Sequence, residues 1–108
     1  MKRLTNAILP IYIEGVNLDI VSGIRFKFQQ GEKVLLFDYP SEKAERLDAY
    51  TVGLRWSVDE TGMFSAQQDV QFDTYVSIVG SDMQVETAPS RFRLTPTLFT
   101  REEVVVDD

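Results

Sequence analysis

The 108-residue chain carries 17 acidic and 11 basic side chains, a net charge of −6, and it contains no histidine and no cysteine. These absences exclude disulfides, thiol nucleophiles and thiolate metal sites, and they remove the commonest general base and metal ligand near neutral pH. A hydrophobic content of 44%, with seven Phe, four Tyr and one Trp, excludes an intrinsically disordered chain.

The chain length fits a single domain, residues 1–108, that can bury a core without metals or disulfides. Residues 55–108 carry ten acidic and four basic side chains, which disfavours contact with nucleic acid or an anionic membrane. The apolar run 7–13 is interrupted by Pro10 and followed by Glu14, so we expect no signal peptide. No run approaches the ~20 apolar residues of a membrane helix. We therefore expect a cytoplasmic protein without a transmembrane segment.

Alternating apolar and polar residues predict strands in the first part of the chain. Residues 8–13 are expected to form a strand with its proline at an edge. Residues 24–28 and 33–39 are expected to form a hairpin with the aromatic side chains inward and a turn over residues 29–32. Residues 40–46 are polar and rich in helix formers, so we expect a short helix or a solvated loop there.

The middle of the chain combines a strand with a helix-capping pattern. Residues 51–56 alternate and should form a strand with its apolar side chains on one face. Ser57 and Glu60 have the spacing of a capping box, and Gly62 is placed to end a helix. We therefore predict a single helical turn over residues 57–62 that links two sheets.

The clearest pattern in the chain is a hairpin over residues 70–87. Residues 70–78 alternate with period two, and residues 83–87 resume that alternation after a turn at residues 80–82. Pro89 is expected to end the returning strand. Residues 91–94 should then form a last short strand, which Pro96 ends.

Six or seven short strands, separated by turns and without a long helical period, predict an all-β fold. The count and length favour a single Ig-like antiparallel β-sandwich, with a small open β-barrel as the alternative. "Ig-like" refers to the architecture alone, because the cysteine pair of antibody domains is absent.

No catalytic or metal-binding pattern stands out. Asp69 and Asp73 share one face of a strand, but four residues along a strand span about 13 Å, which is too far for a glycosidase pair. Asn17 and Asp19 offer too few oxygen ligands for calcium. Basic and aromatic residues alternate at 24–28 and 91–93, so they fall on opposite faces and cannot form one nucleic-acid platform. We expect no catalytic residue, no cofactor and no metal.

Two features are candidates for binding. Trp56 alternates with Val52 and Leu54, which favours a core position, although an exposed ring could hold a sugar or a partner protein. The C-terminal tail, residues 97–108, is expected either to be mobile or to dock on another protein surface. Its apolar side chains are candidates for contact with a neighbouring subunit by strand addition or insertion, or for a final strand of the same domain. These residues are Leu98, Phe99, Val104, Val105 and Val106.

The order of turn motifs over residues 8–100 resembles a group of small prophage-encoded proteins of Gram-positive bacteria, which are similar to the Ig-like N-terminal domain of phage baseplate upper proteins. The resemblance rests on a Gln-Gln-Gly-Glu-Lys turn, a strand that ends in Tyr-Pro-Ser, a Ser-x-x-Glu-Thr turn followed by Phe, and a Leu-Phe pair after a long hairpin. These motifs are found here at residues 29–33, 39–41, 57–64 and 98–99.

The resemblance implies a β-sandwich structural or assembly protein of a phage particle, present in the bacterial host cytoplasm and without a cofactor. Our first hypothesis is therefore a non-enzymatic adaptor that contacts other protein subunits in a homo-oligomer or hetero-assembly. The second is a carbohydrate-binding or adhesion module that uses Trp56 and exposed tyrosines. The third and last is a carboxylate enzyme, which needs two or more acidic side chains to converge. The candidates for that convergence are Asp19, Asp38, Glu60, Asp69 and Asp73.

Overall fold

The computed structural model describes residues 1–80, 84–86 and 90–104, with residues 84–86 described by their backbone. The strands are β1 (Ala7–Tyr12), β2 (Val21–Gln30), β3 (Lys33–Tyr39), β4 (Ala44–Arg46), β5 (Thr51–Trp56), β6 (Val70–Ile78), β7 (Gln84–Glu86) and β8 (Ser90–Phe92). The helical segments are the 3-10 turn η1 (Leu18–Ile20) and the helices α1 (Val58–Met63) and α2 (Arg101–Val104).

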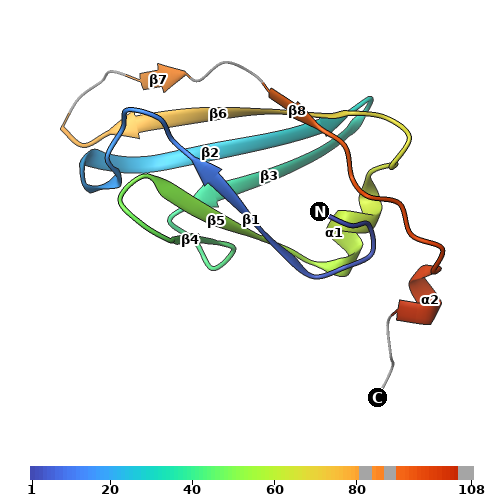
Figure 1. Ribbon diagram of the computed structural model, residues 1–108. Coiled ribbons are helices and arrows are strands. Elements are labelled where there is room, and N and C mark those ends of the chain that lie inside the picture. The colour runs from blue at the N-terminus through green and yellow to red at the C-terminus, as the bar shows by residue number, and fades with distance from the viewer. Residues whose placement is uncertain (81–83, 87–89, 105–108) are drawn as a thin grey trace.

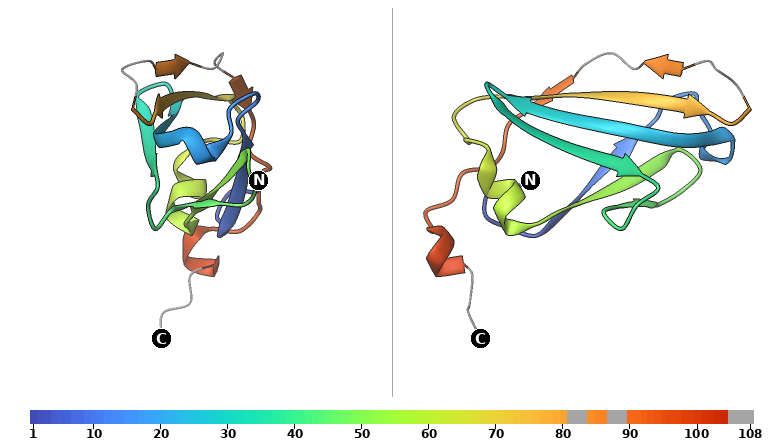
Figure 2. Two further views of the ribbon diagram at one scale, coloured as in Figure 1. Left: turned by 90° about the vertical axis from the view of Figure 1, so that its left-hand side faces the viewer. Right: turned by 180° about the vertical axis from the view of Figure 1, so that it is seen from behind.

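The strands form two antiparallel sheets that pack face to face, as an all-β sandwich requires (Figure 1). One sheet has the order β1-β5-β4. The other has the order β3-β2-β6-β7, and β8 pairs with a separate part of β6. Among the described residues no strand pairing joins the two sheets, so they do not close into a barrel. Figure 2 shows the two layers from the end and from behind.

The predicted hairpins are confirmed. β2 and β3 pair with Phe26 opposite Phe37, and their two-residue turn has Gly31 at φ 60°, a conformation that suits glycine. β6 and β7 pair with Val76 opposite Val85. The predicted turn residues 81–82 and the predicted strand break at Pro89 lie outside the described residues.

Aromatic side chains from both sheets form the centre of the core. Phe28 is fully buried, and its ring centroid lies 4.8 Å from that of Trp56 and 5.6 Å from that of Phe37. Phe72 and Phe92 complete the cluster at 5.5 and 6.0 Å from Phe28. Phe72 is stacked on Phe28 and the other three rings meet it edge-to-face, and both arrangements stabilise a core beyond the area that they bury.

Residues 40–46 are a correction to the sequence prediction. The short helix or loop expected there is wrong for Ala44–Arg46, which form β4 and pair with β5. Ala44 is 3% exposed. Pairing with the edge of β5 satisfies the backbone groups of this segment and buries its alanine, and this tertiary contact outweighs the local helix propensity.

The helical turn between the sheets is confirmed, but the role expected of Gly62 is not. α1 begins at its N-cap Ser57 with both capping-box hydrogen bonds and continues to Met63. Gly62 therefore lies inside the helix rather than at its end. A Cβ at this position would lie 2.5 Å from Cδ2 of Leu4, so the glycine makes room for the N-terminal segment.

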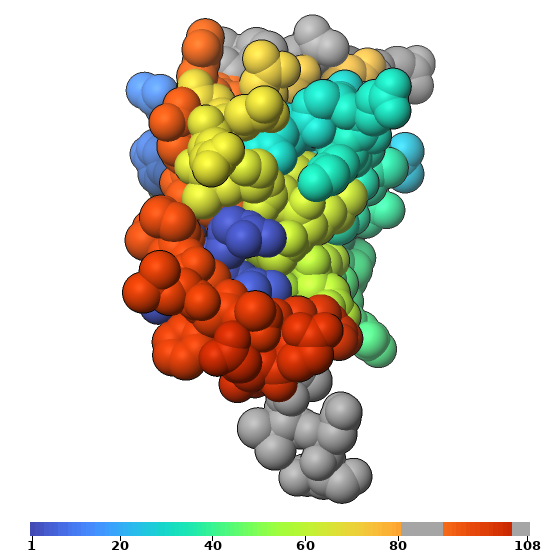
Figure 3. Space-filling model, turned by 90° about the vertical axis from the view of Figure 1, so that its right-hand side faces the viewer, coloured from blue at the N-terminus to red at the C-terminus, as the bar shows by residue number. Residues whose placement is uncertain are grey.

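The N-terminal residues pack against α1 and against the segment that follows β8 (Figure 3). Thr61 is fully buried. Its hydroxyl donates a hydrogen bond to the carbonyl of Thr5 at 2.7 Å and accepts one from the Thr5 N–H at 2.9 Å. The Arg3 guanidinium donates to the carbonyls of Gly62 and Phe64, both at 2.7 Å. These contacts hold the end of the sandwich together.

None of the helices among the described residues is long and apolar enough to cross a bilayer.

Candidate functional site

The outer side of the three-stranded sheet carries a cluster of exposed apolar side chains beside the ion pair between Arg55 and Glu45. We call this surface the β1–β5 face. It consists of Ile8, Tyr12, Leu47 and Tyr50, arranged around Gly53. Ile8 is 55% exposed, Tyr12 64% and Leu47 48%. Contiguous exposed apolar side chains of this kind are typical of contact surfaces.

Gly53 explains how these side chains come together. The position that a Cβ would take at Gly53 lies 3.0 Å from Cδ1 of Leu47 and 3.1 Å from Cγ2 of Ile8. The two side chains therefore meet over the glycine backbone, one from β1 and one from the segment after β4. The rings of Tyr12 and Tyr50 continue the surface, with centroids 6.2 Å apart.

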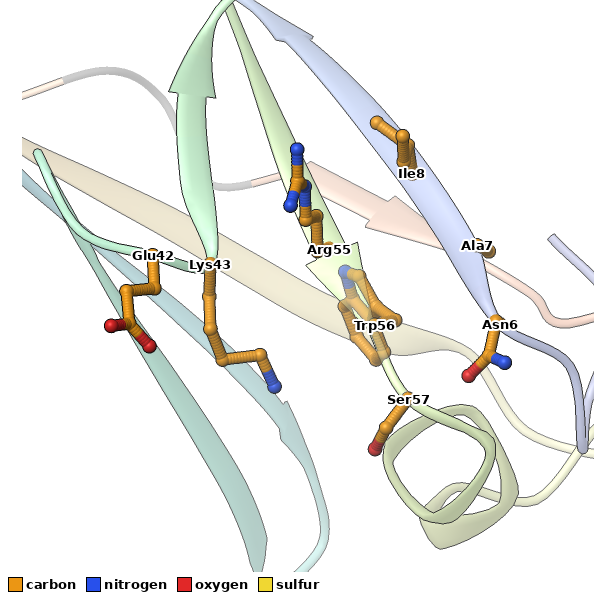
Figure 4. Close-up of a pocket in the computed structure, with 8 residues that line it drawn as sticks. All are labelled: Asn6, Ala7, Ile8, Glu42, Lys43, Arg55, Trp56 and Ser57. Atoms are coloured by element: carbon orange, nitrogen blue, oxygen red, sulfur yellow. The ribbon is translucent and has the colours of Figure 1, made fainter.

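A groove of about 890 Å³ lies beside this face, between the end of β5, the start of β1 and the segment before β4 (Figure 4). We call it the Trp56 groove. Ile8 and Arg55 line it, and Ile8 also belongs to the β1–β5 face, so the two surfaces are continuous. The remaining lining residues are Asn6, Ala7, Glu42, Lys43, Trp56 and Ser57.

Trp56 is buried, yet its polar atom has no partner. The side chain is 2% exposed and packs against Phe28, Phe37 and Phe64. Within the described part of the chain, Nε1 of Trp56 is the buried side-chain nitrogen or oxygen for which no acceptor or donor is present. Buried polar atoms without a partner are rare and call for an explanation.

Two ion pairs flank the groove. Nζ of Lys43 pairs with Oε1 of Glu60, and Nη2 of Arg55 donates to Oε2 of Glu45 at 2.9 Å. The Lys43 ammonium also lies 5.1 Å from the centre of the Phe37 ring, a cation–π contact. Each ion pair is partly solvated, so neither holds its side chain strongly in place.

Glu60 joins the groove to α1. Its carboxylate also accepts the Ser57 N–H at 2.9 Å, and its own N–H donates to the Ser57 hydroxyl at 3.2 Å. Partial burial raises the pKa of Glu60, but the hydrogen bonds from Lys43 and Ser57 together outweigh it and leave the pKa below its ordinary value. The carboxylate is therefore charged at neutral pH.

The candidate interaction residues of the tail lie in different environments. Leu98 is fully exposed at 101%, and Phe99 is 54% exposed. Val104 is half-buried at the end of α2, while Val105 and Val106 lie outside the described residues. α2 is joined to α1 by an ion pair between Arg101 and Asp59, at 2.5 Å. Trp56, the candidate ligand platform, has no ring face open to solvent.

The carboxylates considered for catalysis do not converge. Asp19, in η1, pairs with Arg46 at 2.6 Å, whereas Asp38, in β3, pairs with Arg25 at 2.9 Å. Asp69 pairs with Arg93 at 3.1 Å, and Glu60 with Lys43. Over the described ranges, no three acidic side chains gather where they could hold a metal ion.

Sequence reasoning missed the β1–β5 face. Both the odd and the even positions of the run Ala-Ile-Leu-Pro-Ile-Tyr, residues 7–12, are apolar. This was the available indication that β1 carries apolar side chains on its outer side as well as on its inner side. Leu47 lies far from this run in sequence, so only the strand pairing brings it next to Ile8.

No family model matches this chain, and no curated protein matches it.

Proposed function

We propose that this chain is a non-enzymatic structural or assembly protein of a phage or prophage particle, which acts as an adaptor through contacts with other protein subunits. The phage origin rests on the resemblance of the turn motifs at residues 29–33, 39–41 and 57–64. The adaptor role rests on surface chemistry.

The observation that carries the adaptor role is the β1–β5 face. Ile8, Tyr12 and Leu47 each expose about half of their side chain or more on one side of one sheet. Burying such side chains against a partner is favourable, at roughly 25 cal/mol per Å² of apolar surface removed from water. The fully exposed Leu98 and the half-exposed Phe99 supply a second apolar element at the other end of the chain.

The test is mass spectrometry of particles purified after induction of the prophage in the strain that carries the gene. We expect the polypeptide at many copies per particle. A strain that carries Leu47→Glu should produce particles with much less of it, because the charge would be buried at the contact. Absence of the wild-type polypeptide from particles in which it is expressed would contradict the proposal.

A matched control separates the face from a general effect of added charge. Val79 is 61% exposed and follows β6, on the other sheet. Val79→Glu adds the same charge at an exposed apolar position and should leave incorporation unchanged. Equal loss of both variants would mean that the β1–β5 face has no special role.

A carbohydrate-binding or adhesion module is the second candidate, and one observation favours it. The rings of Tyr12 and Tyr50 lie side by side on the surface, 64% and 38% exposed, with an interplanar angle of 51°. Two adjacent aromatic rings are a feature of sugar platforms. A glycan array compared between wild type and Tyr12→Ala tests this, because binding that Tyr12→Ala abolishes would support the module and no binding to any glycan would exclude it.

A further inference from the structure

We propose that the Trp56 groove binds an extended, uncharged peptide segment of a partner protein, with a main-chain carbonyl of that segment accepting a hydrogen bond from Nε1 of Trp56. This inference rests on the proposed function, because it states how the adaptor would hold part of its partner. It is a different contact from the β1–β5 face, which adjoins the groove at Ile8.

The first support is the unpaired indole N–H. Trp56 is only 2% exposed, and no described residue accepts a hydrogen bond from its Nε1. A buried donor without an acceptor carries the full cost of its lost hydration. A ligand that brings an acceptor recovers this cost, so the groove favours ligands with an accessible oxygen.

The second support is the charge around the groove. Lys43 and Arg55 contribute two positive charges, and each is already paired with a carboxylate. Glu42 adds a further negative charge at the rim, so the three acidic and two basic groups leave the site slightly acidic. An anionic ligand would have to displace an existing partner. A neutral carbonyl would not have to displace a carboxylate from Lys43 or Arg55.

The third support is the mixture of surfaces that line the groove. Ala7 and Ile8 supply apolar surface, while the Asn6 carboxamide and the Ser57 hydroxyl supply polar groups at the edge (Figure 4). An extended peptide offers the same mixture, a small apolar side chain beside backbone carbonyl and amide groups. A volume of about 890 Å³ has room for several residues.

Access to Nε1 requires a small movement of the lining, because the atom is covered. Lys43 and Arg55 are the long side chains there, with 45% and 55% of their side chains exposed. Exposed ion pairs are weak, so either side chain can move aside at little cost.

Trp56 is the only tryptophan, so its indole N–H gives a single resonance in a ¹H–¹⁵N spectrum. The probe is the capped tripeptide acetyl-Ala-Leu-Ala-amide, titrated into the ¹⁵N-labelled full chain. We expect the indole proton to move downfield and to saturate, as a free N–H does when it gains an acceptor. An indole resonance that stays in place up to the solubility of the peptide would overturn the inference.

Acetate and maltotriose, titrated in the same way, identify the kind of ligand. A saturating shift with acetate but not with the tripeptide would mean an anion site and would overturn the peptide inference. A shift with maltotriose alone would also overturn it and would favour the carbohydrate module. We expect both acetate and maltotriose to shift the indole resonance less than the tripeptide does.

Trp56→Phe keeps an aromatic ring but removes the N–H, and binding is then followed through the backbone amides of Ala7 and Ser57. We expect binding to weaken about tenfold, the size of effect that one hydrogen bond to a neutral acceptor can have. Unchanged affinity would overturn the role of the indole N–H. Arg25→Met, on the other sheet, is the matched control and should bind as the wild type does.

The two proposals fail separately. If Leu47→Glu is incorporated into particles normally while the indole resonance responds to the tripeptide, the groove stands and the role of the face fails. If wild-type chain is incorporated, Leu47→Glu is excluded and the indole resonance never responds, the adaptor role stands and the groove inference fails.

Discussion

The two central strand pairs of the sandwich have similar inner sides and different outer sides. β2 and β6 bury Phe26, Phe28 and Val76 and carry mainly charged or polar residues outward, such as Arg25 and Asp73. β1 and β5 also bury an apolar inner side, but outward they present isoleucine, proline and tyrosine from β1, and threonine, glycine and one charged residue, Arg55, from β5. Charged outer residues favour contact with water. The exposed apolar side chains on this side are the basis of the proposed contact surface.

The largest expected contrast is between an inner and an outer aromatic residue. Phe28→Ala should lower the free energy of unfolding by about 3–5 kcal/mol, because the cavity would lie among four aromatic rings. Tyr12→Ala should change it by less than about 0.5 kcal/mol, because the ring is mostly exposed. Urea denaturation measures both. A large loss in Tyr12→Ala would mean that the outer face is structural rather than a contact surface.

The capped helix α1, which connects β5 to β6, should contribute less to the stability of the fold than the aromatic core does. Ser57→Ala removes the side chain that accepts the Glu60 N–H at the start of α1, and should cost about 1 kcal/mol in the same denaturation experiment. Ser57→Thr keeps the hydroxyl and is the control. Equal stability of the alanine and threonine variants would show that the cap does not help to join the two pairs.

Glu60 should make the stability of this link depend on pH. Its pKa in the folded chain lies below the ordinary carboxyl value, so its contribution is complete above that ordinary value and is lost as the pH falls through the folded pKa. The loss should be at most about 1 kcal/mol, because the partner Lys43 is partly solvated. Denaturation between neutral and acidic pH should show a flatter profile for Glu60→Gln than for wild type. Glu14→Gln, at an exposed position, should keep the wild-type profile.

The smallest effect concerns the packing of the outer face itself. Gly53→Ala would place a Cβ against Leu47 and Ile8, and these exposed side chains would have to shift. In a double-mutant cycle, Gly53→Ala should be better tolerated with Leu47→Ala than with leucine, by about 0.5 kcal/mol. Additive effects would mean that Leu47 does not rest on Gly53 in solution, and the face would lose its continuity.

Local patterns were sufficient for most of the strands. Alternation predicted β5 at residues 51–56 and β6 at residues 70–78, and Gly31 marked the turn between β2 and β3. The spacing of Ser57 and Glu60 predicted the capped helix. These features depend on a few neighbouring residues, because period two and turn chemistry are properties of a short segment of backbone.

Contacts between distant segments decided the rest. Ala44–Arg46 form a strand because they pair with the edge of β5, and no local sequence pattern predicts that this edge is available. The β1–β5 face requires Leu47 and Ile8 to meet over Gly53, and the groove requires the end of β5 to lie between residues from two other segments. The unpaired N–H of Trp56 is likewise a property of the packed core. The sequence by itself thus determined the strands, the turns and the cap, whereas the tertiary structure alone decided which apolar side chains remain at the surface, because burial depends on pairings across the whole chain.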